Sequence, residues 1–549
     1  MVATRRPTSF VAASLVAVLF VWALFAAPVA PAARMAEFRL EEATIADITA
    51  AFDAGGLTCQ QLAQLTLNRI TTYDPDLHLM ITINPRLMET AAALDQERRA
   101  SGPRSRLHCI PIVLKDNFDT FDMPTTNGSA VMRNAIPRED GYVTRAVREA
   151  GALIVGKAAM GEFAGASYNT VVGYPVNPYH PLRDTGASSS GSGAGVAANF
   201  AVLGVGTDTS TSVRSPAANN GIVGLRPTTG LISRAGIAPK NLQFDSAGPM
   251  ARTVTDMAIL MTTIAGPDLD DPDGLSGRVF REHPELIGLD YTQFLQRGAL
   301  RGARLGVARD YFGGDPEMDA LAEAAIATMR ELGAEIVDPV YLDRSVVEDF
   351  RIIRAIADYR FREDWEAYLA TFGPEVPKTV EEFLEIYRTE VAASALPPAA
   401  SVLGLLERSL PVSTRDTAYR TLVQYVLPRL TELRLAPYDE YGLDALVFPY
   451  NPTFPSPIDN PVYQADDPTF VRSTVLSPAT VATYASEGAP GIVVPMGFSS
   501  QGLPGAISFM GRPMDDGRMI AFAYDYEQAT LHRRPSPRVP PLPGERISY

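Results

Sequence analysis

Two serine-rich turns and one lysine are the features of this chain that could support nucleophilic chemistry. Residues 186–230 combine a Gly/Ser tract containing Ser188, an apolar segment at 194–206, and a second serine-rich turn containing Ser212. A flexible linker would be polar throughout, whereas this apolar segment is predicted to be buried. Small residues inside an apolar frame indicate a place where backbone amides and hydroxyls surround a reacting group.

Lys115 follows a second apolar segment, Ile110-Pro111-Ile112-Val113-Leu114. A serine hydroxyl is a weak nucleophile and needs a base within hydrogen-bond reach. A lysine can be that base only when it is neutral, and burial in an apolar strand lowers its pKa because desolvation disfavours the charged form. Residue type alone leaves a simpler interpretation open, with Lys115 on the surface and Ser188 and Ser212 as ordinary turn serines.

The serine-rich block carries three consecutive motifs, which read GASSSGS at 186–192, GTDTSTSVRSPA at 206–217 and GIVGLRPTTG at 221–230. Their order and spacing resemble the signature of the amidase signature family of serine hydrolases. The segments IPIVLKDN at 110–117 and APGIVVPMG at 489–497 resemble further parts of the family pattern. The resemblance covers about residues 38 to 531 and is weakest between about 275 and 475.

The resemblance implies a Ser–Ser–Lys catalytic triad. Ser212 would be the nucleophile, Ser188 the bridging serine that passes a proton, and Lys115 the base. The two serines are 24 residues apart, which is the usual separation in the family. In the family the peptide bond before the bridging serine is cis, and here that bond would join Ala187 to Ser188.

The family also stabilises the oxyanion with backbone N–H groups of the turn that ends in the nucleophile, and these map to Thr209, Ser210, Thr211 and Ser212. Ser210-Thr211 replace the usual Gly-Gly of the pattern, which would narrow the pocket or add hydroxyls near the leaving group. Asp208 and Arg214 flank the turn and are predicted to form a structural ion pair. Three further serines are predicted to satisfy buried loop amides, namely Ser189, Ser190 and Ser192.

The resemblance implies one large α/β domain over residues 34–549, although length alone would suggest several domains. Alternating predicted strands and helices indicate an α/β/α sandwich around a mixed, mostly parallel twisted β-sheet. Residues 38–73 are predicted to be helical, with Thr58 as an N-cap, and residues 345–440 mostly helical. The variable region at about 275–475 is expected to shape the substrate pocket.

The N-terminal segment is typical of a targeting signal. Arg5 and Arg6 precede an apolar stretch, and Ala30-Pro31-Ala32 fits a cleavage site. We therefore expect residues 1–33 to be a cleaved signal peptide and the mature protein to be periplasmic or secreted. The alternative is a retained membrane anchor, since eighteen apolar residues are near the lower limit for a span.

Cys59 and Cys109 are the two cysteines of the chain. Cys109 stands in an apolar segment, so we expect a buried free thiol rather than a disulfide, although an exported protein can pair its cysteines. No Cys/His cluster has metal-ligand spacing, and neither a metal nor an organic cofactor is implied.

Composition and charge narrow the function classes. The net charge of −15 and the lack of a basic run argue against nucleic-acid binding. The sequence contains no GxSxG elbow and its five histidines are scattered, which disfavours a Ser–His–Asp hydrolase. The expected protein is an amidase acting on a small-molecule or peptide amide.

Several alternatives remain open at this point. An esterase or carbamate hydrolase would use the same triad, and a non-catalytic binding protein would share the fold. A glutamine-dependent tRNA amidotransferase subunit belongs to the same fold family, but it would need a cytoplasmic partner and tRNA, and the export signal argues against both. A homo-oligomer is compatible with the sequence, which does not reveal the oligomeric state.

Overall fold

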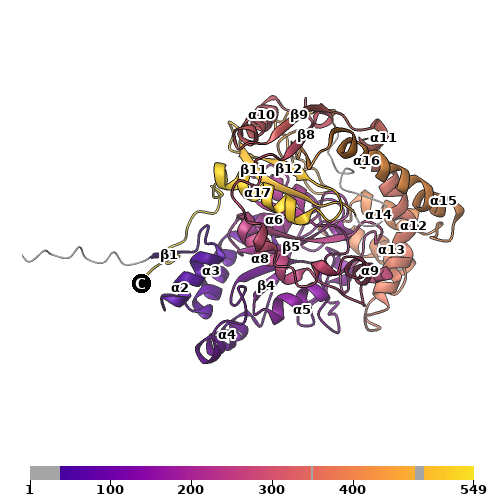
Figure 1. The fold of residues 1–549 in the computed structure, drawn as a ribbon. Coiled ribbons are helices and arrows are strands. Elements are labelled where there is room, and N and C mark those ends of the chain that lie inside the picture. The colour runs from indigo at the N-terminus through magenta and orange to yellow at the C-terminus, as the bar shows by residue number, and fades with distance from the viewer. Residues whose placement is uncertain (1–36, 348–349, 476–487) are drawn as a thin grey trace, which may run out of the picture.

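The structure is a computed structural model that describes residues 37–347, 350–475 and 488–549. The predicted signal peptide at 1–33 lies outside the described residues. The described chain folds around one large β-sheet, with helices on both faces and a helical region at one side (Figure 1). None of its helices combines the length and apolar character needed to cross a membrane.

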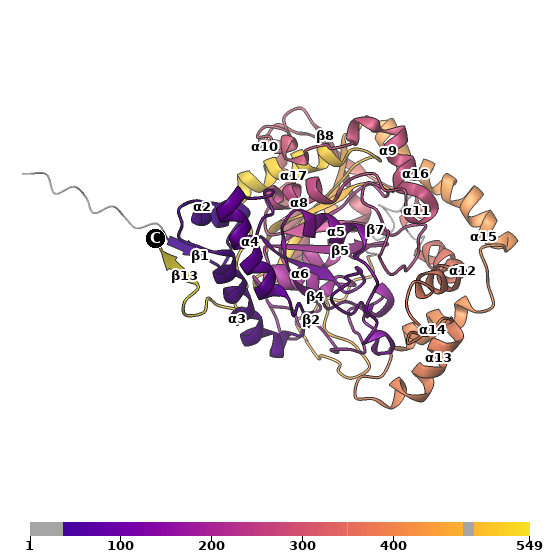
Figure 2. The same cartoon turned by 90° about the horizontal axis from the view of Figure 1, so that it is seen from below.

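Eleven described strands form the central sheet, with helices along its edges and faces (Figures 1 and 2). In spatial order they are β2 (Met80–Ile83), β4 (Leu153–Ala158), β3 (Pro111–Lys115), β5 (Leu203–Asp208), β7 (Ser246–Ala251), β6 (Val223–Arg226), β11 (Gly491–Phe498), β12 (Pro504–Met510), β10 (Ala445–Pro449), β8 (Arg304–Ala308) and β9 (Glu335–Val340). A separate antiparallel pair joins β1 (Glu37–Arg39) to β13 (Arg546–Ser548), so the ends of the described chain lie together.

The expected mixed sheet is confirmed. Among the described strands, parallel pairing occurs in two blocks, β4–β3–β5 and β10–β8–β9. The other neighbouring pairs of this sheet are antiparallel. The expectation of a mostly parallel sheet is therefore too strong, because antiparallel pairs outnumber parallel ones among the described strands. One of the antiparallel pairs, β11–β12, is joined by a short turn without an intervening helix.

The described helices are α2 (Ile45–Asp53), α3 (Cys59–Leu77), α4 (Leu87–Ser101), α5 (Tyr142–Glu149), α6 (Ser190–Ala197), α7 (Arg214–Asn219), α8 (Val254–Ile264), α9 (Leu275–Glu282), α10 (Pro316–Glu331), α11 (Arg344–Val347), α12 (Phe350–Leu369), α13 (Val380–Thr389), α14 (Ala400–Ser409), α15 (Thr417–Thr421), α16 (Leu427–Tyr441) and α17 (Asp516–Thr530). The predicted helical stretch 38–73 is instead a short strand followed by α2 and α3. Thr58 caps α3 as expected, with its side chain accepting from the backbone N–H of Gln61.

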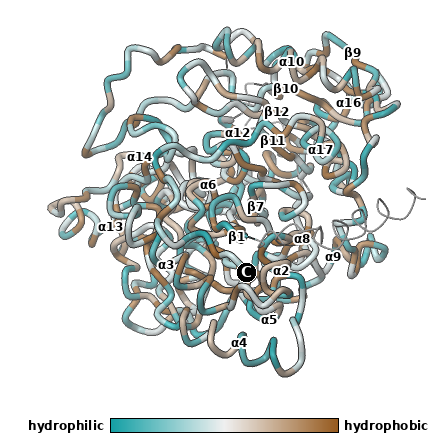
Figure 3. Tube along the Cα trace, turned by 90° about the vertical axis from the view of Figure 1, so that its left-hand side faces the viewer, coloured by the Kyte–Doolittle hydropathy of each residue, from teal (hydrophilic) through white to brown (hydrophobic). Residues whose placement is uncertain are grey.

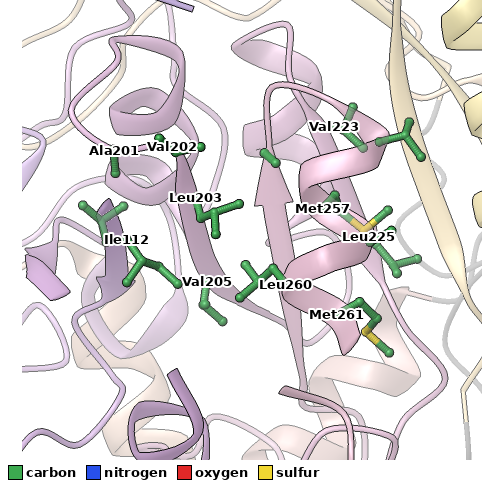
Figure 4. Packing of buried hydrophobic residues seen from close by; sticks show 14 of the residues in the cluster. Ile112, Ala201, Val202, Leu203, Val205, Val223, Leu225, Met257, Leu260 and Met261 are labelled. Carbon is green, nitrogen blue, oxygen red and sulfur yellow. The ribbon is translucent and has the colours of Figure 1, made fainter. Parts of the chain in front are cut away.

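Alternating side chains place a hydrophobic core on each face of the sheet. In β11, Ile492 and Val494 belong to the core that contains α8 and α17, whereas Val493 belongs to the core that contains α6, α7 and α16. Figure 4 shows the first core, with Leu203 and Val205 of β5 near Leu260 of α8. The hydropathy trace shows hydrophilic stretches on the outer helix α4 (Figure 3). The expected α/β/α sandwich is therefore confirmed.

The region from α11 to α16 confirms the prediction that residues 345–440 are mostly helical. In Figures 1 and 2 it lies at one side of the sheet. An aromatic cluster holds it there: the rings of Phe163 and Trp365 lie 5.1 Å apart, and those of Phe163 and Phe383 6.1 Å apart. The loop that contains Phe163 thus connects this region to the sheet.

The prediction of free thiols is wrong, because Cys59 and Cys109 form a disulfide. Cys59 is the first residue of α3, and Cys109 lies two residues before β3. Their Cα atoms are 5.5 Å apart although 50 residues separate them in the chain. Sequence alone does not show that two such distant segments meet.

Candidate active site

Lys115 is the last residue of β3, between the parallel strands β4 and β5, and its side chain is fully buried. Its Nζ atom donates to the Oγ atom of Ser188 at 2.8 Å and to the Oγ1 atom of Thr207 at 2.7 Å. A third contact reaches the carbonyl oxygen of Thr207 at 3.3 Å. The structure therefore brings the predicted base and the predicted bridging serine into direct contact.

Burial lowers the pKa of Lys115 well below its usual value. The positive charge of Lys240 lowers it further, whereas Asp208 and Asp245 act in the opposite direction. The surroundings of Lys115 therefore favour its neutral amine, which can accept a proton.

Ser188 follows a cis peptide bond from Ala187, in agreement with the expectation. Its carbonyl oxygen accepts a hydrogen bond from the backbone N–H of Gly161 at 3.0 Å. The next residue, Ser189, donates its backbone N–H to the carbonyl oxygen of Ser212 at 3.2 Å. The two predicted catalytic serines therefore lie on adjoining turns.

The other serines of the tract differ in their contacts. Ser189 Oγ donates to the carbonyl oxygen of Thr207 at 3.2 Å, and Ser192 Oγ donates to that of Val205 at 3.1 Å. Both serines thus have a structural role as expected, but they bind backbone groups of strand β5 rather than of a loop. Ser190 makes no such contact, because its buried Oγ atom has no hydrogen-bond partner among the described residues.

The turn from Thr209 to Ser212 connects β5 to α7. Ser212 is 6% exposed, and Ser210 and Thr211 are partly exposed beside it. Within the described chain, the backbone N–H groups of Ser210, Thr211 and Ser212 donate no hydrogen bond. The side chain of Thr209 makes a hydrogen bond, because its Oγ1 atom donates to the carboxylate of Asp245 at 2.6 Å. The turn thus offers backbone donors next to Ser212.

A buried ion pair holds this turn in place. The carboxylate of Asp208 accepts from the backbone N–H of Val213 at 3.1 Å and from Nε of Arg214 at 3.1 Å, which confirms the predicted pair. Arg226 is a second partner of Asp208, at 3.3 Å, that the sequence did not predict. Burial acts to raise the pKa of Asp208, but the two arginines lower it to about 2. Asp208 is therefore ionised near neutral pH and fixes both ends of the turn.

Sequence reasoning missed Thr207 and Asn117. The Oγ1 atom of Thr207 accepts from both Lys115 and Asn117, the latter at 3.1 Å. Both residues stand inside recognised motifs, since Asn117 ends IPIVLKDN and Thr207 begins the run TDTSTS. Asn117 is two residues after Lys115, and Thr207 directly precedes Asp208. This closeness in sequence is the signal that would have identified them.

A buried carboxylate connects the site to the helical region. The Oε1 atom of Glu162 accepts from the hydroxyl of Tyr387 on α13 and, at 2.7 Å, from that of Thr170. Glu162 follows Gly161, which binds the carbonyl oxygen of Ser188. Burial raises the pKa of Glu162 to about 7. The helical region, which belongs to the weakly matching part of the sequence, therefore contacts a loop next to the triad.

Among the described residues, one group has potential metal-ligand atoms close together: Cys59, His108 and Cys109. The two sulfur atoms are joined in the disulfide, and the ring of His108 contacts the carbonyl oxygen of Leu94 at 3.1 Å. These atoms are thus committed to other bonds and do not form a metal site.

Comparison with known proteins places this geometry in a family. The amidase family profile matches residues 61–520. A probable amidase from Arabidopsis thaliana is 31% identical over 522 residues, covering 91% of this chain and 92% of that protein. A glutamyl-tRNA(Gln) amidotransferase subunit from Myxococcus xanthus is 32% identical over 522 residues, covering 91% of this chain and 100% of that protein.

A solved structure agrees with these sequence matches. The native peptide amidase from Stenotrophomonas maltophilia has a TM-score of 0.79 and 34% identity, covering 90% of this chain and 98% of that chain. The family profile extends over most of the chain, and the sheet, the cis bond and the Lys115–Ser188 contact lie within the matched range. The chain therefore belongs to the amidase signature family and is an amidase, a hydrolase of carboxylic amide C–N bonds.

Proposed function

We propose that this amidase is exported and hydrolyses peptide amides through an acyl-Ser212 intermediate. The observation that carries the mechanism is the 2.8 Å contact between Nζ of Lys115 and Oγ of Ser188, made by a lysine whose pKa burial lowers strongly. A neutral amine can take the proton of Ser188 while Ser188 takes the proton of Ser212.

The first half of the reaction forms an ester. Oγ of Ser212 attacks the amide carbon, and the new oxyanion accepts hydrogen bonds from backbone N–H groups of the turn from Thr209 to Ser212. The intermediate then collapses, the C–N bond breaks, and the leaving nitrogen takes the proton that Lys115 returns through Ser188. The products of this half are free amine or ammonia and acyl-Ser212.

The second half releases the acid. A water molecule gives a proton to the same Ser188–Lys115 relay and attacks the ester carbon. Collapse of this second intermediate breaks the bond to Ser212, whose oxygen recovers the proton. The amide substrate and one water molecule enter the cycle, and the acid and the amine or ammonia leave it, so atoms and charges balance.

Peptide amides are the proposed substrate class because two of the similar solved structures are of peptide amidase. One is the Stenotrophomonas maltophilia enzyme described above, and the other is a peptide amidase in complex with the competitive inhibitor chymostatin, at 34% identity and a TM-score of 0.80. Likeness to these proteins supports the substrate class, and a hydrolysis panel tests it directly.

The experiment is a hydrolysis panel with matched variants. The substrates are a C-terminal peptide amide, a fatty amide, an aryl anilide, a carbamate and a p-nitrophenyl ester. We expect the peptide amide to have the highest kcat/KM, and Ser212→Ala and Lys115→Ala to abolish turnover. Ser190→Ala is the matched control, since Oγ of Ser190 has no partner in the described structure.

Each outcome of the panel has a defined meaning. Turnover that survives Ser212→Ala would overturn the proposed nucleophile. Preference for the ester or carbamate would move the substrate class to the alternative hydrolase on the same triad. Failure of Ser212 to react with a serine-directed phosphonate, together with no turnover, would favour a non-catalytic binding protein.

Export is supported by the N-terminal segment and by the disulfide. Disulfides persist in oxidising compartments and are rare in the cytosol, and Cys59–Cys109 is such a bond. Fractionation of the producing cell and N-terminal sequencing test this point. A mature N-terminus near residue 33 in the periplasm or medium is expected, whereas a cytosolic protein with an intact N-terminus would contradict it. Recovery of the intact chain in the membrane fraction would indicate a retained anchor.

A further inference from the structure

Lysine is a rare residue in this chain. The sequence contains four lysines among its 48 basic residues: Lys115, Lys157, Lys240 and Lys378. Arginine stays protonated in proteins, whereas a buried lysine can lose its proton. A buried lysine can therefore hold or release a proton where an arginine cannot.

Lys240 lies beside the triad. It lines a cavity of about 10 Å³ together with Asn117, Thr207, Thr209 and Asp245. Thr207 is the residue that accepts from Nζ of Lys115, so one threonine is shared between the cavity wall and the proposed base. A space of this size has room for about one water molecule, so little water lies between Lys240 and the threonine that binds Lys115.

The position of Lys240 is fixed by its surroundings. Its Nζ atom donates to the carbonyl oxygen of Ala164 at 2.6 Å. Its own backbone N–H and that of Asn241 each donate to the carboxylate of Asp245 at 2.9 Å, and Thr209 donates to the same carboxylate. Lys240, Asp245 and the proposed oxyanion turn therefore form one connected unit.

The other charges near the two lysines are largely balanced. Asp208 faces Lys115 but is paired with Arg214 and Arg226. Arg234 lines the same cavity and is paired with Asp271 at 2.7 Å.

On the neighbouring strand, Lys157 lies 3.5 Å from Asp116 and is buried with it. Asp245 is the carboxylate that attracts the proton of Lys240.

We propose that Lys240 is a positioning residue that determines which of two lysines, Lys115 or Lys240, carries a proton. The ammonium group of Lys240 repels a second proton from Lys115. This lysine pair therefore binds one proton, and Lys240 holds it. This proposal rests on the proposed role of Lys115 as the base. It assigns to Lys240 no contact with substrate.

The titration of the pair is consistent with this division. Burial lowers the pKa of Lys240 to about 8, with Asp245 acting in the opposite direction, whereas the pKa of Lys115 lies well below its usual value. Near neutral pH, Lys240 therefore keeps its charge, and the shift at Lys115 favours the neutral amine there. Because the two sites interact, the acid limb of the pH profile belongs to the pair.

The test compares Lys240→Met with Lys240→Arg through the pH dependence of kcat/KM. Loss of the charge in Lys240→Met raises the pKa of Lys115, so the acid limb should move to higher pH by on the order of one unit. Activity below the limb would then fall about tenfold and recover as the pH is raised. Lys240→Arg keeps a permanent charge and should keep the acid limb of the wild type.

Two results would overturn the proposal. One is an acid limb of Lys240→Met at the wild-type position. The other is a loss of activity in Lys240→Met that is equal at all pH values and is shared by Lys240→Arg, because that pattern indicates a structural role.

A second readout separates this inference from the proposed substrate. The rate at which a serine-directed phosphonate inactivates Ser212 depends on activation of the serine but not on amide turnover. A shifted limb in this rate, without turnover of any amide, would support the lysine pair and contradict the proposed substrate. Amide turnover with unshifted acid limbs in both assays would contradict the proposed role of the lysine pair and leave the proposed substrate supported.

Discussion

The amine of Lys115 and the hydroxyl of Ser188 form a 2.8 Å hydrogen bond between two side chains with no exposed surface. Burial favours the neutral lysine, and the neutral lysine is the form that can accept a proton from the bridging serine. The same burial that stabilises the sheet around β3 therefore prepares the proposed base.

This relationship predicts that Lys115→Arg is inactive. Arginine cannot be deprotonated in a protein, so it keeps the positive charge but cannot act as a base. We expect kcat to fall by about 10²- to 10⁴-fold, the usual contribution of a general base. Lys378→Arg, whose lysine lies on the helical region and binds backbone carbonyls, is the control and should keep its activity. Activity of Lys115→Arg within tenfold of the wild type would contradict the assignment.

A second prediction concerns the buried charge cluster at the nucleophile turn. Asp208→Asn leaves Arg214 and Arg226 buried without their anion. Removing one partner of a buried ion pair destabilises a protein by about 3–5 kcal/mol. Chemical denaturation should show this loss in the free energy of unfolding. Glu37→Gln is the control, because Glu37 and Arg39 form an exposed pair that contributes about 1 kcal/mol or less. Equal effects of the two substitutions would contradict the prediction.

The parts of the site that the sequence predicted are those encoded within short motifs. Lys115, Ser188 and Ser212 could be proposed as catalytic because each stands in a contiguous pattern that resembles the family signature. The pair Asp208–Arg214 was predicted because its members are six residues apart and flank one turn, and the structure confirms this pair. The mixed sheet followed from the alternation of apolar strands and helices.

The parts that the sequence did not predict depend on contacts between distant segments. The second partner of Asp208 is Arg226, which reaches it from β6. The disulfide joins residues 50 positions apart, and Glu162 meets Tyr387 across 225 positions. One sequence without an alignment carries no signal for such pairs, because each residue is equally compatible with many partners.

The disulfide predicts a large effect of reduction on stability. In the chain-entropy model, a cross-link that closes a loop of about 50 residues stabilises the folded state by about 4 kcal/mol. The wild-type protein should therefore show a lower denaturation midpoint in the presence of a thiol reductant. The double variant Cys59→Ser, Cys109→Ser should unfold at that lower midpoint whether or not the reductant is present. A midpoint of the wild type that is insensitive to complete reduction, verified by thiol counting, would contradict this expectation.

The buried carboxylate of Glu162 predicts a pH dependence of stability with a defined sign. Burial raises the pKa of Glu162 from 4.5 to about 7 in the folded protein, so the folded state binds an extra proton between these values. The free energy of unfolding therefore falls as the pH rises through this window. Glu162→Gln mimics the protonated acid and does not titrate. Relative to the wild type, this variant should become more stable between pH 5 and pH 8, by on the order of 1–3 kcal/mol.

The comparison of wild type and variant isolates Glu162, because other buried carboxylates such as Asp119 and Glu527 are present in both proteins. Glu381→Gln is the matched control for the change of side chain, since Glu381 is exposed on the same helix as Tyr387. If the difference between Glu162→Gln and the wild type stays constant from pH 5 to pH 8, Glu162 does not change its protonation state on unfolding. The hydrogen bond to Tyr387 would then join an ionised carboxylate at both pH values, and the contact between the helical region and the site loop would be independent of pH.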